Sequence, residues 1–137
     1  MIWLILLSTT WSGVSGISEY HRMRDRTLYA QHNIEYQYHS DVWHKMEFVD
    51  ASLAIGVGIT IGLDAIDNES VWVAVSDMVL AGAIRWNVRD GAYNLMNGNS
   101  FYYRSPNTMS GVEQCGLPVV KLSVLAGAIL LRILVED

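Results

Sequence analysis

The chain has 137 residues, of which 51% are hydrophobic and 17% charged, and its formal net charge at pH 7 is −5. This length, without a long linker rich in proline, glycine or serine, predicts one domain. The acidic charge and the lack of a run of lysine and arginine exclude nucleic acid as an expected partner. Cys115 is the only cysteine, which excludes a disulfide within the chain and a cysteine zinc site.

Four apolar segments predict an all-α fold: a membrane four-helix bundle with polar connecting segments, in a single integral membrane domain. The expected spans are residues 1–17, 48–66, 71–88 and 117–135. The first segment carries no charged side chain, although Val14-Ser15-Gly16 resembles the cleavage site of a secretory signal peptide. A signal peptide normally begins with basic residues, and their absence here favours a span that is retained.

The connections between these segments predict how neighbouring helices meet. Residues 67–70 form a short turn, so that the second and third spans are expected to be antiparallel neighbours. Ala54, Gly58 and Gly62 recur at helical spacing, and we expect these two helices to pack closely through them. Residues 19–47 contain all four histidines but neither proline nor glycine, and we expect them to be partly helical.

The basic residues predict the orientation in the membrane. With four spans, eight of the nine basic residues fall on one side. These eight are Arg22, Arg24, Arg26, Lys45, Arg85, Arg89, Arg104 and Lys121. Positively charged residues stay preferentially in the cytoplasm. We therefore expect a multi-pass protein whose two termini are both non-cytoplasmic and whose two long connections are cytoplasmic.

This topology gathers several polar side chains at the cytoplasmic end of the helices. The candidate ligand-binding residues are Asp41, His44, Arg85, Arg89, Asp90 and Asn94. Arginines one turn apart are well suited to a phosphate, including that of a lipid headgroup. Two interpretations stay open. One is a site that binds a lipid headgroup, a metal or a small anion, and the other is a network of ion pairs that only holds helices together.

A divalent metal is the one cofactor that the residue types suggest. The candidate ligands are His32, Glu35, His39, Asp41 and His44. Asp41 and His44 are three residues apart and would be neighbours on a helix. Imidazole and carboxylate ligands suit zinc or iron. The alternatives are a structural polar pair at the start of a helix and an ordinary solvated connection.

Ionisable residues also fall inside the apolar segments. Asp77 lies too far along the third span from Arg85 for a direct ion pair. We expect its partner on another span, or a hydrogen bond from its protonated carboxyl group. Lys121 and Arg132 share one face of the last span, and we expect them to extend toward opposite headgroup regions.

Two short stretches, DVWHKMEF at the start of the second span and RWNVRDGAYN at the end of the third, resemble small polytopic integral membrane proteins of bacteria and their phages. The matching residues are Asp41, Trp43 and His44 with Arg85, Trp86, Asp90 and Asn94. The pair Val88-Arg89 departs from the apolar residues of that pattern, which leaves the role of Arg89 open. Because these proteins have no assigned function, the resemblance implies the fold and not an activity.

Three functions are compatible with these features. The first is a membrane protein of unknown specific function with a cytoplasm-facing polar site, and the second is a membrane hydrolase that uses a metal at this site. The third is a pore-forming or lysis protein, in which a homo-oligomer aligns Asp50, Asp64 and Asp77 along a path. No nucleophile constellation is visible, so that the enzyme question stays open. The lipid bilayer is the partner common to all three.

Overall fold

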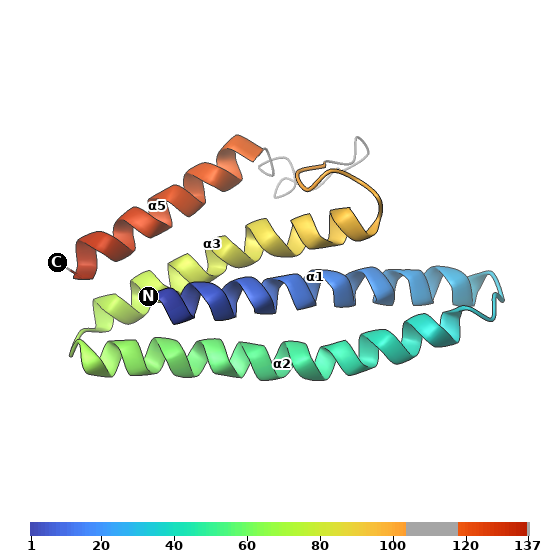
Figure 1. Cartoon of the computed structure of the whole chain (residues 1–137), viewed down its shortest axis with the longest axis horizontal. Helices are drawn as coiled ribbons and strands as arrows, with labels where there is room; N and C mark the ends of the chain where they lie inside the picture. Colours follow the sequence, from blue (N-terminus) through green and yellow to red (C-terminus); the bar gives the residue numbers. More distant parts are fainter. Residues whose placement is uncertain (104–117, 137) are drawn as a thin grey trace.

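The computed structural model describes residues 1–103 and 118–136, and within these it contains four helices and no strand. The helices are α1 (Ile2–Ala30), α2 (Tyr36–Asp67), α3 (Val71–Met96) and α5 (Pro118–Glu136). The all-α class is therefore confirmed, and consecutive helices run in roughly opposite directions (Figure 1). Arg104 and Cys115 lie outside the described residues.

The first two helices are longer than the segments expected to span the membrane. The connection expected at residues 19–47 is almost entirely helical, because no proline or glycine interrupts it. Only residues 31–35 separate the two helices, and His32 turns the chain there with a φ of 54°. With 29 and 32 residues, α1 and α2 are about 43 and 48 Å long, which exceeds the roughly 30 Å hydrocarbon core of a bilayer.

Three of the described helices, α2, α3 and α5, are long and apolar enough to cross a membrane. The distribution of side chains supports this reading, because large apolar residues point outward: Phe48 is 76% exposed and Ile66 71%. Polar residues such as Asp77 and Arg132 are instead buried. A surface this apolar is typical of a protein surrounded by lipid. The chain is therefore a multi-pass membrane protein, and the crossing by residues 1–17 stays a prediction.

Small residues on α1 allow this helix to lie between α2 and α3, while α5 packs on α3 (Figure 1). The small residues Ser8, Ser12, Ser15 and Gly16 are buried on α1, together with Leu4, His21 and Leu28. A Cβ atom added to Gly16 would lie 2.8 Å from the Cβ atom of Ala92 and closer still to the backbone of α3. Such close approach through small residues is typical of helix pairs in membranes. The backbones of α1 and α3 therefore meet at Gly16.

The expected close packing of α2 and α3 through Ala54, Gly58 and Gly62 is wrong. A Cβ atom added to Gly58 or Gly62 would meet nothing within 4 Å. The physical reason is that α2 and α3 each pack mainly against α1 and contact each other less. Serines and Gly16 on α1 supply the small surface that was expected on α2.

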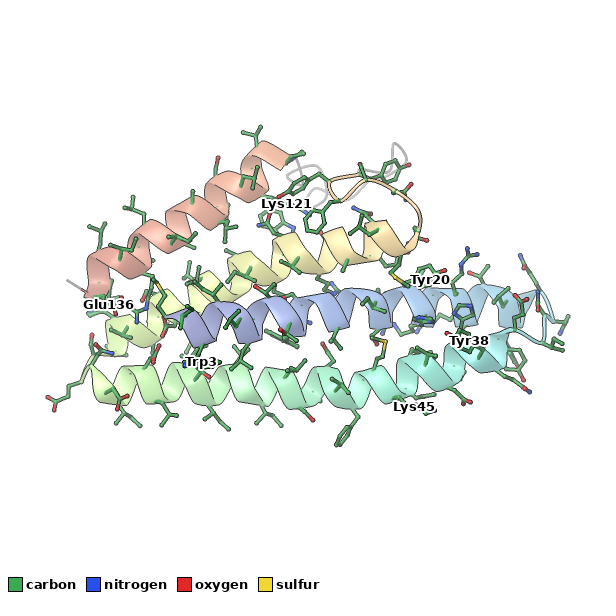
Figure 2. All side chains as sticks on the ribbon, in the orientation of Figure 1. Trp3, Tyr20, Tyr38, Lys45, Lys121 and Glu136 are labelled. Carbon is green, nitrogen blue, oxygen red and sulfur yellow. The ribbon has the colours of Figure 1, made fainter. Side chains whose placement is uncertain are left out.

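Aromatic side chains lie toward both ends of the bundle. Trp3 lies near the start of α1, whereas Tyr20 and Tyr38 lie near the end where α1 and α2 connect (Figure 2). Tryptophan and tyrosine are enriched where a membrane meets water. This placement suits a bundle whose long axis crosses the bilayer.

We expect Gly16→Ala to destabilise the protein by about 1–3 kcal/mol, because the added methyl group overlaps with α3. Gly13→Ala is the matched control, since a Cβ atom at Gly13 meets nothing within 4 Å. This control should gain up to about 1 kcal/mol from the better helix propensity of alanine. Thermal unfolding in detergent micelles, followed by circular dichroism, measures both changes. Equal melting temperatures for the two variants would contradict the contact.

Candidate functional site

The two predicted site residues on α2 lie on its exposed surface. Asp41 and His44 are both exposed, and the ring of His44 stacks on that of Trp43 with 3.7 Å between the centroids. The Trp43 indole in turn donates a hydrogen bond of 3.3 Å from Nε1 to Asp25 on α1. The DVWH stretch therefore contacts α1.

Three of the predicted site residues on α3 each contact a different partner. Arg89 lies 3.6 Å from the carboxylate of Glu19 on α1. Asp90 accepts a hydrogen bond of 2.6 Å from Lys121 on α5. Asn94 donates from Nδ2 to the carbonyl oxygens of Phe101 and Tyr103 at 3.0 and 2.9 Å, and so it holds the segment after α3. The convergence of all six candidate residues on one ligand stays a prediction.

The expectation that Lys121 and Arg132 extend toward the headgroups is wrong. Lys121 is 8% exposed and Arg132 is 1% exposed, and both point into the interface between α5 and α3. Lys121 pairs there with Asp90, and Arg132 pairs with Asp77. A carboxylate on a packed helix offers each cation a direct partner, and in lipid an unpaired charge is costly.

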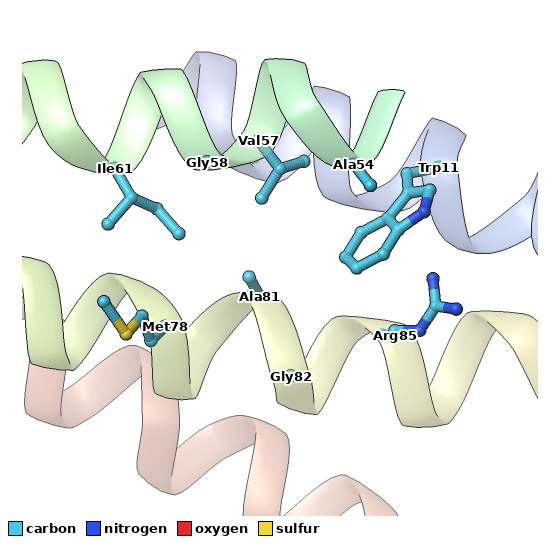
Figure 3. A pocket seen from close by; sticks show the side chains of 9 residues that line it. All are labelled: Trp11, Ala54, Val57, Gly58, Ile61, Met78, Ala81, Gly82 and Arg85. Atoms are coloured by element: carbon cyan, nitrogen blue, oxygen red, sulfur yellow. The ribbon is translucent and has the colours of Figure 1, made fainter. Parts of the chain in front are cut away.

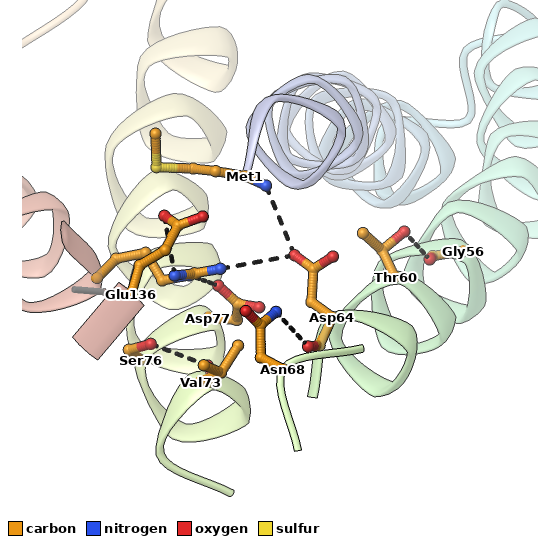
Figure 4. A network of polar contacts seen from close by, with 10 residues as sticks. Met1, Gly56, Thr60, Asp64, Asn68, Val73, Ser76, Asp77 and Glu136 are labelled. Atoms are coloured by element: carbon orange, nitrogen blue, oxygen red, sulfur yellow. Dashed lines mark hydrogen bonds and ion pairs between the residues drawn. The ribbon is translucent and has the colours of Figure 1, made fainter. Parts of the chain in front are cut away.

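The most deeply buried polar cluster surrounds Arg132, and Figure 4 labels its partners Asp64, Asp77 and Glu136. Its Nε donates a hydrogen bond to the buried carboxylate of Asp77. The other guanidinium nitrogens lie 3.9 Å from Asp64 and 3.2 Å from Glu136, and the Met1 amine lies 3.6 Å from Asp64. The expectation that Asp77 finds its partner on another helix is confirmed. This cluster connects α2, α3 and α5 near the turn between α2 and α3.

The predicted metal ligands are dispersed. His32 and Glu35 are exposed at the turn between α1 and α2, and Asp41 and His44 are exposed further along α2. Across residues 1–103 and 118–136, no three histidine, cysteine, aspartate or glutamate side chains are placed to hold a metal ion. The structure therefore gives no geometric support to the metal interpretation.

His39 instead pairs with a histidine of α1. The Nδ1 atoms of His21 and His39 lie 2.8 Å apart, a distance at which one ring donates a hydrogen bond to the other. Tyr20 and Tyr38 pack edge-on against these rings at the end of the bundle (Figure 2). Burial, and then the charge of a protonated His39, lower the pKa of His21.

Arg85 occupies a different environment from the other cations. Its Nη2 atom donates a hydrogen bond of 3.1 Å to the hydroxyl of Ser15, and its guanidinium carbon lies 3.8 Å from the centroid of the Trp11 ring. Asp50 on α2 acts on Arg85 electrostatically without forming an ion pair with it. Two buried donors, Arg85 Nη1 and Trp11 Nε1, have no hydrogen-bond acceptor among the described residues.

Arg85 and Trp11 lie at one end of an open groove of about 280 Å³ between α2 and α3 (Figure 3). Apart from these two, the lining residues are small or apolar: Ala54, Val57, Gly58, Ile61, Met78, Ala81 and Gly82. The only charged group of the lining is the guanidinium of Arg85. The groove is therefore apolar along its length and cationic at one end.

The comparisons with known proteins return no relative. No family model matches the chain, and neither a curated protein nor a solved structure is significantly similar to it. The resemblance of the DVWH and RWNVRDGAYN stretches to small bacterial and phage membrane proteins therefore stays a prediction.

Sequence reasoning did not find Trp11 and Ser15, because both lie in a segment read only as an apolar span. One signal was available: Ser8, Ser12 and Gly16 recur at intervals of four, which marks a face that approaches another helix. Trp11 and Ser15 lie beside that face and one turn from each other. The contact of Trp11 with Arg85 depends on tertiary packing, and no local pattern indicates it.

We expect Asp77→Asn to destabilise the protein by about 3–5 kcal/mol, because it leaves the buried guanidinium of Arg132 without its closest charged partner. Glu136→Gln removes a more exposed partner of the same arginine and should cost less than about 1 kcal/mol. Denaturant titration in detergent micelles measures both. A loss for Asp77→Asn as small as that of the control would show that the buried pair contributes little.

The pH dependence of stability should reflect His21. Because its pKa is lower in the folded than in the unfolded protein, its contribution to stability is present above about pH 6.5 and is lost as the pH falls. The melting temperature should therefore decrease between about pH 7 and pH 5, and His21→Gln should flatten this decrease. His32→Asn, at the exposed turn, is the control that should leave the slope unchanged.

Proposed function

We propose that this integral membrane protein binds an anionic group, either the phosphate of a lipid or a small inorganic anion, at Arg85. One observation carries the proposal. Two N–H donors, Arg85 Nη1 and Trp11 Nε1, are buried at the same end of the groove and have no acceptor among the described residues. Figure 3 shows the two side chains pointing toward one another at that end.

An anion satisfies both donors, and an anion bound there shares Arg85 with the Asp50 carboxylate, which acts on the guanidinium without forming an ion pair with it. A buried donor without an acceptor costs about 1–3 kcal/mol, and more when the donor is charged. Oxygens of a phosphate can accept hydrogen bonds from the guanidinium and the indole together. Ser15 and the Trp11 ring hold the guanidinium in place, so that little side-chain entropy remains to be lost when the anion binds.

The depth of Arg85 in the bilayer suits a headgroup. Arg85 lies fourteen residues after Val71, which is about 21 Å along α3. With Val71 at one edge of a hydrocarbon core roughly 30 Å thick, Arg85 lies within about 9 Å of the other edge. Ser15 and Trp11 hold the guanidinium near that depth, so that a phosphate bound to it lies closer to the bilayer centre than the surrounding headgroups do.

The basic residues favour the cytoplasmic leaflet as the location of this site. In the proposed orientation both termini are non-cytoplasmic. The basic residues Arg22, Arg24, Arg26 and Lys45 lie beyond Arg85, toward the end of the bundle where α1 and α2 connect. Each of them adds attraction for anionic lipids at that surface. Glu19 neutralises part of this charge through Arg22 and Arg89.

The alternative of an oligomeric pore lined by Asp50, Asp64 and Asp77 has less support. Asp77 is fully buried within one chain and hydrogen-bonded to Arg132, so that lining a path would require breaking this pair. The metal-assisted hydrolase has less support as well, because its proposed ligands are dispersed over α2 and the turn before it.

We expect Arg85→Gln to weaken anion binding by about 10–100-fold, since a hydrogen bond to a charged group contributes about 1.5–3 kcal/mol. Titration calorimetry with inorganic phosphate tests a free anion, and native mass spectrometry with phosphatidylglycerol in mixed micelles tests a lipid. If Arg85→Gln weakens the binding of phosphatidylglycerol alone, the ligand is a lipid headgroup. If it weakens the binding of both phosphatidylglycerol and inorganic phosphate, the ligand is the phosphate itself.

Arg24→Gln is the matched control, because it removes the same charge from an exposed position on α1. This variant should bind inorganic phosphate as the unchanged protein does and should lose no more than about fivefold in phosphatidylglycerol affinity, because one basic residue near the surface contributes about 1 kcal/mol. Equal affinities of the Arg85→Gln variant and the unchanged protein in both arms would contradict the proposed function.

A further inference from the structure

We propose that the groove between α2 and α3 holds one acyl chain of a phospholipid whose phosphate lies on Arg85. This inference rests on the proposed function and adds the chemical class of the ligand to it. Neither the anion-binding donors nor the charge of Arg85 requires an apolar ligand. The evidence for a bound acyl chain comes from the shape of the groove.

The shape of the groove suits a thin apolar chain. Its floor consists of the buried side chains of Val57, Ile61 and Ala81. Its rims carry Gly58 and Gly82, where an added Cβ atom would meet nothing within 4 Å. No described side chain of the protein fills the space above these two glycines.

The dimensions favour a thin occupant. From Ala54 to Ile61 on α2 and from Met78 to Arg85 on α3, the groove extends over seven residues, or about 10 Å. A helix with its side chains is about 10–12 Å wide, and pockets for whole drug-sized ligands begin at about 300 Å³. A volume of about 280 Å³ therefore suits a segment of one acyl chain and not a packed helix.

The groove has a charged part followed by an apolar part, which is the order of phosphate and acyl chain in a phospholipid. The direction of this order in the bilayer matches as well. The cationic end at Arg85 lies about 21 Å from the start of α3, and the apolar part continues from there toward the turn between α2 and α3. A lipid in the leaflet nearer to Arg85 has its phosphate outermost and its chain toward the bilayer centre. Phosphate and chain thus fall on the charged and the apolar part of one groove (Figure 3).

Filling the groove tests the inference. Gly58→Leu and Gly82→Leu each place a side chain in the space proposed for the acyl chain, and the open surroundings of both glycines allow the protein to fold. Gly56→Leu and Gly62→Leu are matched controls on α2, because their surroundings are equally open and neither residue lines the groove. Native mass spectrometry measures the phosphatidylglycerol that stays bound to the detergent-purified full chain, and calorimetry measures inorganic phosphate.

We expect Gly58→Leu and Gly82→Leu to lower phosphatidylglycerol affinity at least tenfold and to leave phosphate affinity and melting temperature unchanged. The controls should retain both ligands. Unchanged lipid binding in the groove variants overturns the inference, even where Arg85→Gln abolishes phosphate binding and so upholds the proposed function. A dimer of the unchanged protein that Gly58→Leu dissociates also overturns it, because a second copy would then occupy the groove. Loss of phosphate together with lipid in a groove variant that still melts normally overturns it as well.

Discussion

The close approach of α1 to α3 at Gly16 determines the positions of most other groups in the bundle. Because one glycine and three serines are buried on α1, this helix packs closely against α3, and it also packs against α2. Trp11 and Ser15 then reach Arg85, and Glu19 reaches Arg89. The same placement keeps α2 and α3 apart and leaves the groove between them open to lipid.

Ion pairs determine the position of α5. This helix packs on α3, and its two cations pair with Asp90 and Asp77, which are about 20 Å apart along α3. Asn87 adds a hydrogen bond of 3.1 Å to the backbone carbonyl of Lys121. Lipid gives no hydrophobic driving force for helix association, so that specific polar contacts at two separate heights determine which faces meet and in which register.

The sequence was sufficient to predict the helices but not to predict which face of each helix lies in the interior. The turn at residues 67–70 and the interhelical partner of Asp77 were predictable, because a short polar segment and a buried charge have few structural solutions. The interior face was not, because apolar residues surround each helix and leave little periodicity. Two small-residue motifs, at residues 8–16 and 54–62, have the same spacing. Only the first contacts another helix through its glycine, and nothing local distinguishes the two.

The uninterrupted course of α1 has a mechanical consequence. A single helix of 29 residues carries Trp11 and Ser15 beside Arg85 and, one to two turns further on, His21 beside His39. The helix continues without a break through Ser12-Gly13 and Ser15-Gly16, and it contains no proline. Rotation of α1 about its axis therefore displaces the Trp11 indole and the His21 imidazole at the same time. The contact with Arg85 and the contact with His39 are in this way coupled through one helix.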